Sequence, residues 1–475
     1  MTPSPKRGRH AAPVTKPFRT QFRRWPHPHH AKPRPAAGPR RRLATAGLGA
    51  LTVTGVTTLA LTSAAPAFAS SARAAAATTA TARESHQRGQ LVSVTPLRSL
   101  PTVTAVRSEL TGDDFDASSV RYGIRSYRVV YRTVDAHRRP TTASGLMVLP
   151  DRGARQLSVV SYEHGTATYR GDAPSESPTG SGSAPAYTFA SAGYAAAAPD
   201  YLGLGTGPGL HPYLDLPSET TATLDMLRAV RQYEAGHGVT LHRDVLATGF
   251  SQGGSATLAL GRALAHGADP YFRIGAMAPI SGPYDLPGAE LPAILNGDLI
   301  RLNPDQQLGE KYTVLYAAYG LVGLNRVHRF YSSPAQVFQA PYASTIEILL
   351  DGNHPGDQLI AGTPDQLSQL LTPRGYALLR HPTGALATAL RIDSSQCNWT
   401  PRVPARLYYA SNDEQVVNAN TFHCQAAFAA HGATIPTVNL GTPDYAGSRH
   451  SGSGAAGTGQ IVRWFSQLAP ANGQH

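Results

Sequence analysis

A serine between two glycines is the strongest candidate for a nucleophile in this sequence. The stretch Gly249-Phe-Ser-Gln-Gly253 follows a short apolar run, Val245–Ala247, and small helix-forming residues follow it from Gly254 onward. This G-x-S-x-G spacing is typical of a sharp strand-to-helix turn that presents a serine hydroxyl above a sheet. In a chain with 46 glycines the motif alone also fits an ordinary Gly/Ser-rich turn, so the rest of the chain must decide.

A serine hydroxyl needs a base within hydrogen-bond reach, and that base needs an anion that fixes its tautomer. Asp413 follows a predicted strand that ends at Ala410, and His450 lies in a predicted loop before the last helix. In a parallel sheet covered on both faces, such groups meet at the carboxyl ends of the strands. We therefore expect Ser251, Asp413 and His450 to act together, in the chain order expected of one fold family.

Each member of this set has an alternative. Asp413 also fits a turn residue or an acid at a helix N-terminus, with Glu414 as the substitute acid. His450 also fits a solvated loop histidine, and its main rival as base is His423, which lies inside a predicted helix.

Alternating strands and helices must position these groups. The predicted strands cover residues 126–134, 141–149, 157–162, 194–199, 245–247, 274–280, 405–410 and 437–440. The first two form an antiparallel hairpin at a sheet edge. The predicted helices cover residues 186–192, 218–234 (with Ser218 as N-cap), 418–430 and 459–468. This alternation predicts an α/β fold with a mostly parallel sheet covered by helices on both faces.

The alternation stops between residues 281 and 401. That stretch is rich in Tyr and Leu and reads as helices over residues 312–327, 343–350 and 364–371. Since it is too long for a loop, we interpret it as a cap or lid inserted over the strand ends. The alternative is an ordinary helical layer of the core.

The charge distribution argues against nucleic-acid binding. The formal net charge is +12, but residues 1–42 contain 12 Lys plus Arg and no acid, which leaves 30 basic and 30 acidic residues in the remainder. We predict that residues 1–69 are a secretory signal peptide, because the apolar run 43–62 precedes the cleavage-type sequence Ala65-Pro-Ala-Phe-Ala69. Arg40-Arg41-Arg42 resembles a twin-arginine signal. The alternative is an uncleaved membrane anchor.

An Ala/Thr/Ser-rich linker over residues 70–90 is predicted to be disordered, and the globular domain covers 91–475. The two cysteines, Cys397 and Cys424, fit one disulfide in an oxidised, secreted protein, while two unrelated buried thiols are the alternative. No Cys/His spacing has a zinc pattern, a metal site at His27, His29 and His30 is rejected, and no metal or organic cofactor is implied.

From about residue 110 to 470 the chain resembles the α/β-hydrolase superfamily, and within it secretory lipases and actinobacterial-type esterases. The likeness rests on Tyr162-Glu-His-Gly-Thr166, Pro199-Asp-Tyr-Leu-Gly-Leu204, Gly249-Phe-Ser-Gln-Gly253, Asn412-Asp413 and His450. The resemblance implies Ser251 as nucleophile, His450 as base and Asp413 as orienting acid.

The resemblance also implies an oxyanion hole. The backbone N–H of Gln252 would be one donor, and Gly165 or Thr166 would supply the second. Asp200 is a rival donor, and its alternative role is a structural cap on the following loop. Gln252 replaces the glycine often found after the serine in these lipases, which leaves the subfamily and the substrate open.

These observations predict a secreted, extracellular serine hydrolase that cleaves small-molecule or lipid carboxylic esters through an acyl-enzyme on Ser251. A contact of the lid with a lipid surface stays open, as do the acyl chain length and the oligomeric state. A serine peptidase on the same fold and a non-catalytic binding protein are the two alternatives.

Overall fold

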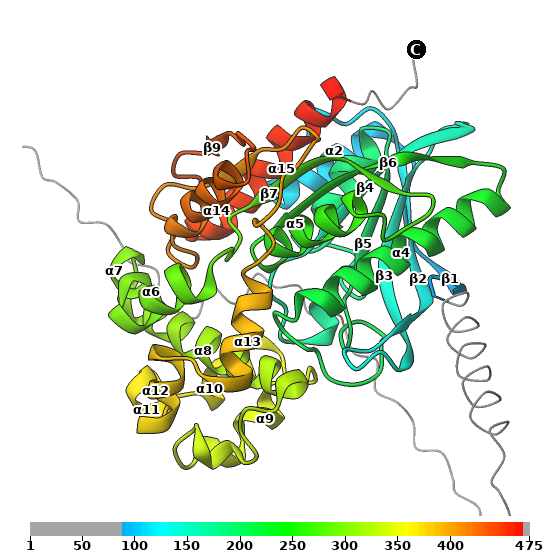
Figure 1. Cartoon of the computed structure of the whole chain (residues 1–475). Coiled ribbons are helices and arrows are strands. Elements are labelled where there is room, and N and C mark those ends of the chain that lie inside the picture. The colour runs from blue at the N-terminus through cyan, green and yellow to red at the C-terminus, as the bar shows by residue number, and fades with distance from the viewer. Residues whose placement is uncertain (1–87, 469–475) are drawn as a thin grey trace, which may run out of the picture. The chain divides into compact units, whose positions relative to one another are not determined.

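Nine strands form one sheet in the computed structural model, which describes residues 88–468 (Figure 1). Their order is β1-β2-β3-β5-β4-β6-β7-β8-β9. Pairing is antiparallel from β1 to β5 and parallel from β5 to β9. The strands are β1 Leu91–Leu100, β2 Ile124–Val134, β3 Pro140–Pro150, β4 Gln156–Glu163, β5 Ala195–Pro199, β6 Thr240–Phe250, β7 Arg273–Ile280, β8 Leu407–Tyr409 and β9 Thr437–Asn439.

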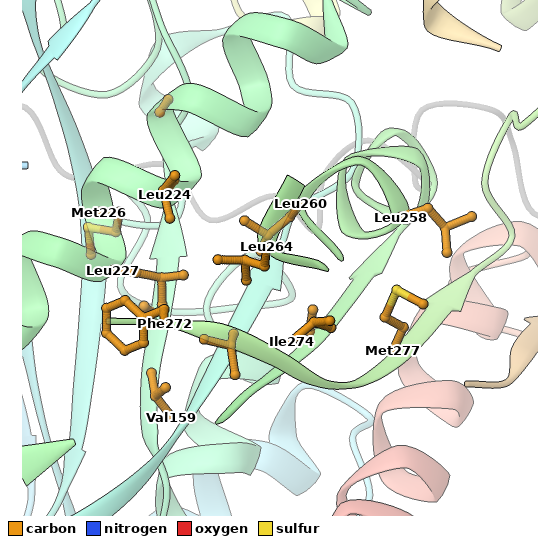
Figure 2. Packing of buried hydrophobic residues seen from close by; sticks show 14 of the residues in the cluster. Val159, Leu224, Met226, Leu227, Leu258, Leu260, Leu264, Phe272, Ile274 and Met277 are labelled. Carbon is orange, nitrogen blue, oxygen red and sulfur yellow. The ribbon is translucent and has the colours of Figure 1, made fainter. Parts of the chain in front are cut away.

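Helices bury both faces of this sheet, as alternating strands and helices predict. One face packs against α4 (Leu216–Gly236), α5 (Gln252–Ala265) and α14 (Ala419–Ala430). In Figure 2, side chains of α4 and α5 meet Val159 of β4 and Ile274 and Met277 of β7. The other face packs against α2 (Val103–Gly112), α3 (Ala184–Ser191) and α15 (Arg449–Leu468), and the short helix η3 (Arg170–Asp172) lies in the loop after β4.

The chain between β7 and β8 forms a separate helical group, drawn in yellow-green to orange in Figure 1. We call residues 286–393 the helical insertion. Its leucine- and tyrosine-rich core is a cluster of its own, apart from the two clusters on the sheet. Its helices are η4 Leu286–Glu290, α6 Leu291–Asn296, α7 Asp298–Leu302, α8 Gln306–His328, η5 Pro334–Gln336, η6 Tyr342–Ser344, α9 Ile346–Leu349, α10 Gly356–Gly362, α11 Leu367–Leu370, α12 Pro373–Arg380 and α13 Gly384–Asp393.

Both ends of the helical insertion are attached to α14. At its start, the Asp285 backbone N–H donates to the side chain of Asn420, 2.9 Å away, and the Asp285 carboxylate pairs with His423. Just after its end, Cys397 forms a disulfide with Cys424. The predicted cysteine pairing is therefore present, and one helix of the sheet layer fixes where the insertion begins and ends.

The predicted hairpin is present as β2 and β3, but β1 pairs outside it and forms the sheet edge. No strand is predicted at β1, because this segment lacks the regular alternation of a half-buried strand. The prediction of Ser218 as N-cap was wrong. The helix starts two residues earlier, and the carboxylate of Asp215 accepts from the Ser218 N–H.

The predicted linker ends too late at residue 90. Arg88 pairs with the buried Asp225, and the Gly89 N–H donates to the carbonyl of Arg132, so these residues are already part of the fold. The signal peptide predicted for residues 1–69 and the rest of the linker lie outside the described residues. Among residues 88–468, no helix combines the length and apolar character needed to cross a membrane.

Candidate active site

Ser251 lies at the junction of β6 and α5 with φ 57° and ψ −122°. A non-glycine residue with positive φ is strained, and such strain persists only where the surroundings hold it. Here the Ser251 N–H donates to the carbonyl of Ile280, 2.9 Å away. The flanking glycines are required, because a Cβ on Gly249 or Gly253 would collide with the chain at Glu163. The sequence motif therefore forms the expected sharp turn.

The structure brings Ser251, His450 and Asp413 together from three distant parts of the chain. The Nε2 atom of His450 lies 2.9 Å from the Ser251 hydroxyl, and its Nδ1 atom lies 2.9 Å from Asp413 Oδ2. The other oxygen of Asp413 accepts from the backbone N–H groups of Gln415 and Val416. With Nδ1–H donating to the carboxylate, Nε2 is left to accept the serine proton.

His450 lies in the second position of α15, and the predicted loop around it was wrong, because this helix begins at Arg449. His450 is 2% exposed. Burial lowers the pKa of His450, but the Asp413 carboxylate, helped by Glu414 and Glu290, outweighs burial and raises that pKa above its ordinary value. The ring is therefore a stronger base than a free imidazole.

The two rival residues make other contacts. Glu414 is buried and accepts from the Ser448 hydroxyl at 2.6 Å and from the Arg449 N–H, so it holds the N-terminus of α15. A carboxylate at a helix N-terminus is favourable to the helix dipole. His423 lies on α14 and pairs with Asp285 at 2.8 Å instead of reaching Ser251.

Three of the four predicted oxyanion residues lie on chain segments next to Ser251. Gln252 is the first residue of α5, so its backbone N–H has no acceptor within its own helix. Gly165 and Thr166 follow β4, and a Cβ on Gly165 would touch the ring of Phe250, which precedes the serine. The loop after β4 therefore packs against the serine turn.

The fourth predicted residue, Asp200, does not serve as an oxyanion donor. Its backbone N–H donates to the carbonyl of Ser144. Its carboxylate accepts from the hydroxyls of Ser144 and Ser175 and from the Ser175 N–H, and it is fully buried. These contacts tie Asp200 to β3 and to the segment after η3, which is a structural role, although not the predicted cap on the following loop.

An apolar pocket with an open mouth lies between Ser251 and the helical insertion. Leucines dominate its wall, with Glu290 and Gln415 as polar members; α8 contributes Tyr316, Ala317, Gly320, Leu321 and Leu324, and α12 and α13 contribute Leu379, Leu386 and Leu390. Burial raises the pKa of Glu290 to about 8. The leucine-rich wall suits an apolar group.

Three residues next to this site are not among those predicted from the sequence. Glu219 and His211 hold the side chain of Gln252, and Gly320 faces the pocket. The sequence does contain a hint of Glu219. This residue lies three and four residues before Ala222 and Thr223, and this helical spacing puts its carboxylate on the face of α4 that is buried. Within residues 88–468, no group of three or more His, Cys, Asp or Glu side chains is arranged to hold a metal ion.

No family model and no curated protein matches this sequence. Solved structures do match. A variant of the rice cell wall degrading esterase LipA from Xanthomonas oryzae is 26% identical, with a TM-score of 0.70 over 81% of this chain and 99% of that chain. A LipA structure without the substitution is 26% identical, with a TM-score of 0.67 over 80% and 98%. Candida antarctica lipase A is 18% identical, with a TM-score of 0.52 over 74% and 76%, and supports the fold alone.

Proposed function

We propose that this chain, which has the α/β-hydrolase fold and esterases among its structural neighbours, cleaves carboxylic esters through an acyl-enzyme on Ser251. One observation carries the proposal. Two hydrogen bonds of 2.9 Å connect the Ser251 hydroxyl to His450 and His450 to Asp413, at the mouth of an apolar pocket. A buried serine joined in this way to a base is an activated nucleophile.

In the first half of the reaction, Ser251 Oγ attacks the ester carbonyl carbon while its proton moves to His450 Nε2. Asp413 stabilises the imidazolium that forms and keeps its proton on Nδ1. The N–H of Gln252, together with that of Gly165 or Thr166, donates to the oxyanion. His450 then protonates the alcohol oxygen, the C–O bond breaks and the alcohol leaves.

In the second half, a water molecule gives a proton to His450 and attacks the acyl carbon. The second tetrahedral intermediate collapses, Ser251 recovers its proton and the carboxylic acid leaves. Because Ser251, His450 and Asp413 already lie within hydrogen-bond distance of one another, little reorganisation would be needed at the reacting centre.

The helical insertion would serve as a cap. Its pocket residues lie over Ser251, and their leucines offer an apolar surface to one limb of the ester. The cap bounds 281–401 remain part of this proposal, and the hydrolase domain, predicted for 91–475, begins no later than Arg88.

Export from the cell is proposed from the signal-type sequence in residues 1–69. The disulfide between Cys397 and Cys424 supports it, because such bonds persist in oxidising compartments and are rare in the cytosol. The serine-peptidase alternative is not favoured, since the solved neighbours are esterases and lipases.

The decisive variant is Ser251→Ala, assayed on p-nitrophenyl esters. Loss of a triad nucleophile typically lowers kcat about 10⁶-fold. Ser255→Ala is the matched control, because its hydroxyl lies one turn along α5 and donates to the carbonyl of Pro283. We expect a fluorophosphonate probe to label the wild type and the Ser255 variant, but not the Ser251 variant. Ester hydrolysis retained without Ser251 would refute the proposal.

A further inference from the structure

The side chain of Gln252 is anchored by two buried groups on the segment before and within α4. Its amide nitrogen lies 2.6 Å from Glu219 Oε1 and 3.2 Å from His211 Nε2. All three residues are at most 2% exposed. The residue that follows the nucleophile is therefore held at its side chain as well as along its backbone.

The orientation of this amide follows from the chemistry of its partners. The Nδ1 atom of His211 lies 2.8 Å from the Leu202 carbonyl, so Nδ1 carries the proton and Nε2 is an acceptor. Burial lowers the pKa of His211 to about 3, which keeps the ring neutral. Both neighbours of the Gln252 amide thus accept, and only its NH₂ group satisfies both.

The same cluster reaches the loop after β4. The Tyr213 hydroxyl lies 2.9 Å from the Thr166 hydroxyl, and the Tyr213 ring stacks on Tyr319 of α8 at 4.1 Å between centroids. The Tyr319 hydroxyl donates to the carbonyl of Ala167. One buried cluster therefore contacts Gln252 on one side and the predicted second oxyanion segment on the other.

The peptide between Ser251 and Gln252 is in a strained conformation that a rotation would relieve. Ser251 is strained at φ 57°. In the peptide between the two residues, the Ser251 carbonyl accepts from the Gly254 N–H at 2.8 Å, but the Gln252 N–H has no acceptor within α5. A rotation of the peptide between the two residues would relax the strain and turn this N–H away. An anchored Gln252 side chain opposes that rotation.

We propose that Glu219 and His211 are positioning residues of the oxyanion hole, which hold the Gln252 N–H toward the developing negative charge. This inference rests on the proposed esterase function and adds two residues to it. Neither touches the reacting atoms; both act through the side chain of Gln252.

The test compares Glu219→Leu, Glu219→Gln and His211→Phe with the wild type. Glutamine keeps an acceptor for the Gln252 amide, whereas leucine removes it, and phenylalanine keeps the ring of His211 without its acceptor. Removing a whole oxyanion donor costs about 10²–10³ in kcat, so we expect misalignment to cost about 10- to 100-fold. KM should change less than about twofold, and Glu219→Gln should restore most of kcat.

The second measurement is the affinity for a boronic acid that mimics the tetrahedral intermediate. A purely structural role of Glu219 and His211 would leave this affinity unchanged. We expect it to fall by the same factor as kcat in Glu219→Leu and His211→Phe. Glu234→Leu is the matched control, because Glu234 is also buried on α4 but lies far along the helix from Gln252. That variant should lower the melting temperature and leave kcat and inhibitor affinity unchanged.

Two results would overturn the inference: a Glu219→Leu enzyme with wild-type kcat, or one whose kcat falls without a matching loss of inhibitor affinity. Either result leaves the esterase proposal standing as long as Ser251→Ala is inactive. An active Ser251→Ala enzyme would instead remove the function on which the inference rests.

Discussion

The sheet and the helical insertion contribute different kinds of residues to the site: polar groups from the sheet region and apolar side chains from the insertion. The sheet region presents polar groups near the carboxyl ends of its strands, where each side chain has a fixed partner, as Asp413 after β8 does with His450. The insertion presents a wall of leucines around a pocket, where shape matters more than any one contact. The comparison suggests that changes in the sheet should alter the rate on all esters alike, whereas changes in the insertion should alter the choice among them.

Among the variants that test this comparison, the largest effect should come from Asp413→Asn. An amide in place of the carboxylate favours the wrong tautomer of His450, which typically lowers kcat about 10⁴-fold. We expect the same factor on acetyl, butyryl and octanoyl p-nitrophenyl esters. A factor that changes strongly with chain length would break the division between the two regions.

Gly320 should show the reverse behaviour. Of three glycines in α8, Gly309 and Gly323 have a packing reason, because a Cβ would lie 2.9 Å from the backbone of Ile300 and 2.7 Å from Tyr213. A Cβ on Gly320 would meet nothing within 4 Å, and Gly320 lines the pocket. A glycine inside a helix costs about 1 kcal/mol of stability relative to alanine. Since no packing contact requires a glycine at position 320, the space it leaves in the pocket accounts for its presence.

We therefore expect Gly320→Leu to fold well and to fill part of the pocket. Its kcat/KM should fall about 100-fold on octanoyl esters and stay near wild type on acetyl esters, since a few methylenes in an apolar pocket are worth several kcal/mol. Gly112→Leu is the matched control, because a Cβ there also meets nothing within 4 Å and α2 lies outside the pocket. An equal loss on both esters would mean that the pocket does not select acyl length.

A substitution at Lys311 tests whether the helical insertion can unfold locally while the sheet stays folded. The buried Lys311 ammonium donates to the carbonyls of Ile360, Thr363 and Pro364. Lys311→Met leaves those acceptors unpaired and should cost about 2 kcal/mol. Hydrogen exchange should then quicken in residues 306–390 while the sheet strands keep their protection. Equal quickening throughout would show that the two regions unfold together.

The smallest effect concerns pH. His450 must be neutral to accept a proton, and its pKa is raised above the ordinary 6.5 by Asp413, Glu414 and Glu290 against the opposing effect of burial. Activity should therefore fall as pH drops through a midpoint above 6.5, so that less than half remains at pH 6.5. In Asp413→Asn the midpoint should move to lower pH. A midpoint below 6.5 in the wild type would contradict the environment described for His450.

The sequence predicted the sheet region well because its motifs have strict geometric requirements. Gly249 and Gly253 have to be glycine where the chain approaches Glu163, and such requirements are visible in the residues themselves. Strand and helix types in this region follow from periodicity, although Asp215, rather than Ser218, caps α4.

The insertion could be predicted only as helical. Its pocket depends on how eleven helical segments of residues 286–393 pack, and no local pattern fixes that arrangement. The anchor of Gln252 was missed for a related reason, because Glu219 and Gln252 are 33 positions apart and meet only once α4 has packed beside α5.

The attachment of the helical insertion to α14 has a consequence for protein engineering. Asn420, His423 and Cys424 lie on one helix and hold both ends of the insertion, through Asp285 and Cys397. A foreign segment that keeps a matching Asp and Cys at its two junctions would meet the same docking points. Chimaeras spliced at residues 285 and 397 should therefore exchange the helical insertion as one unit. With the proposed function, they would change the acyl preference and leave the sheet with Ser251 and His450 unchanged.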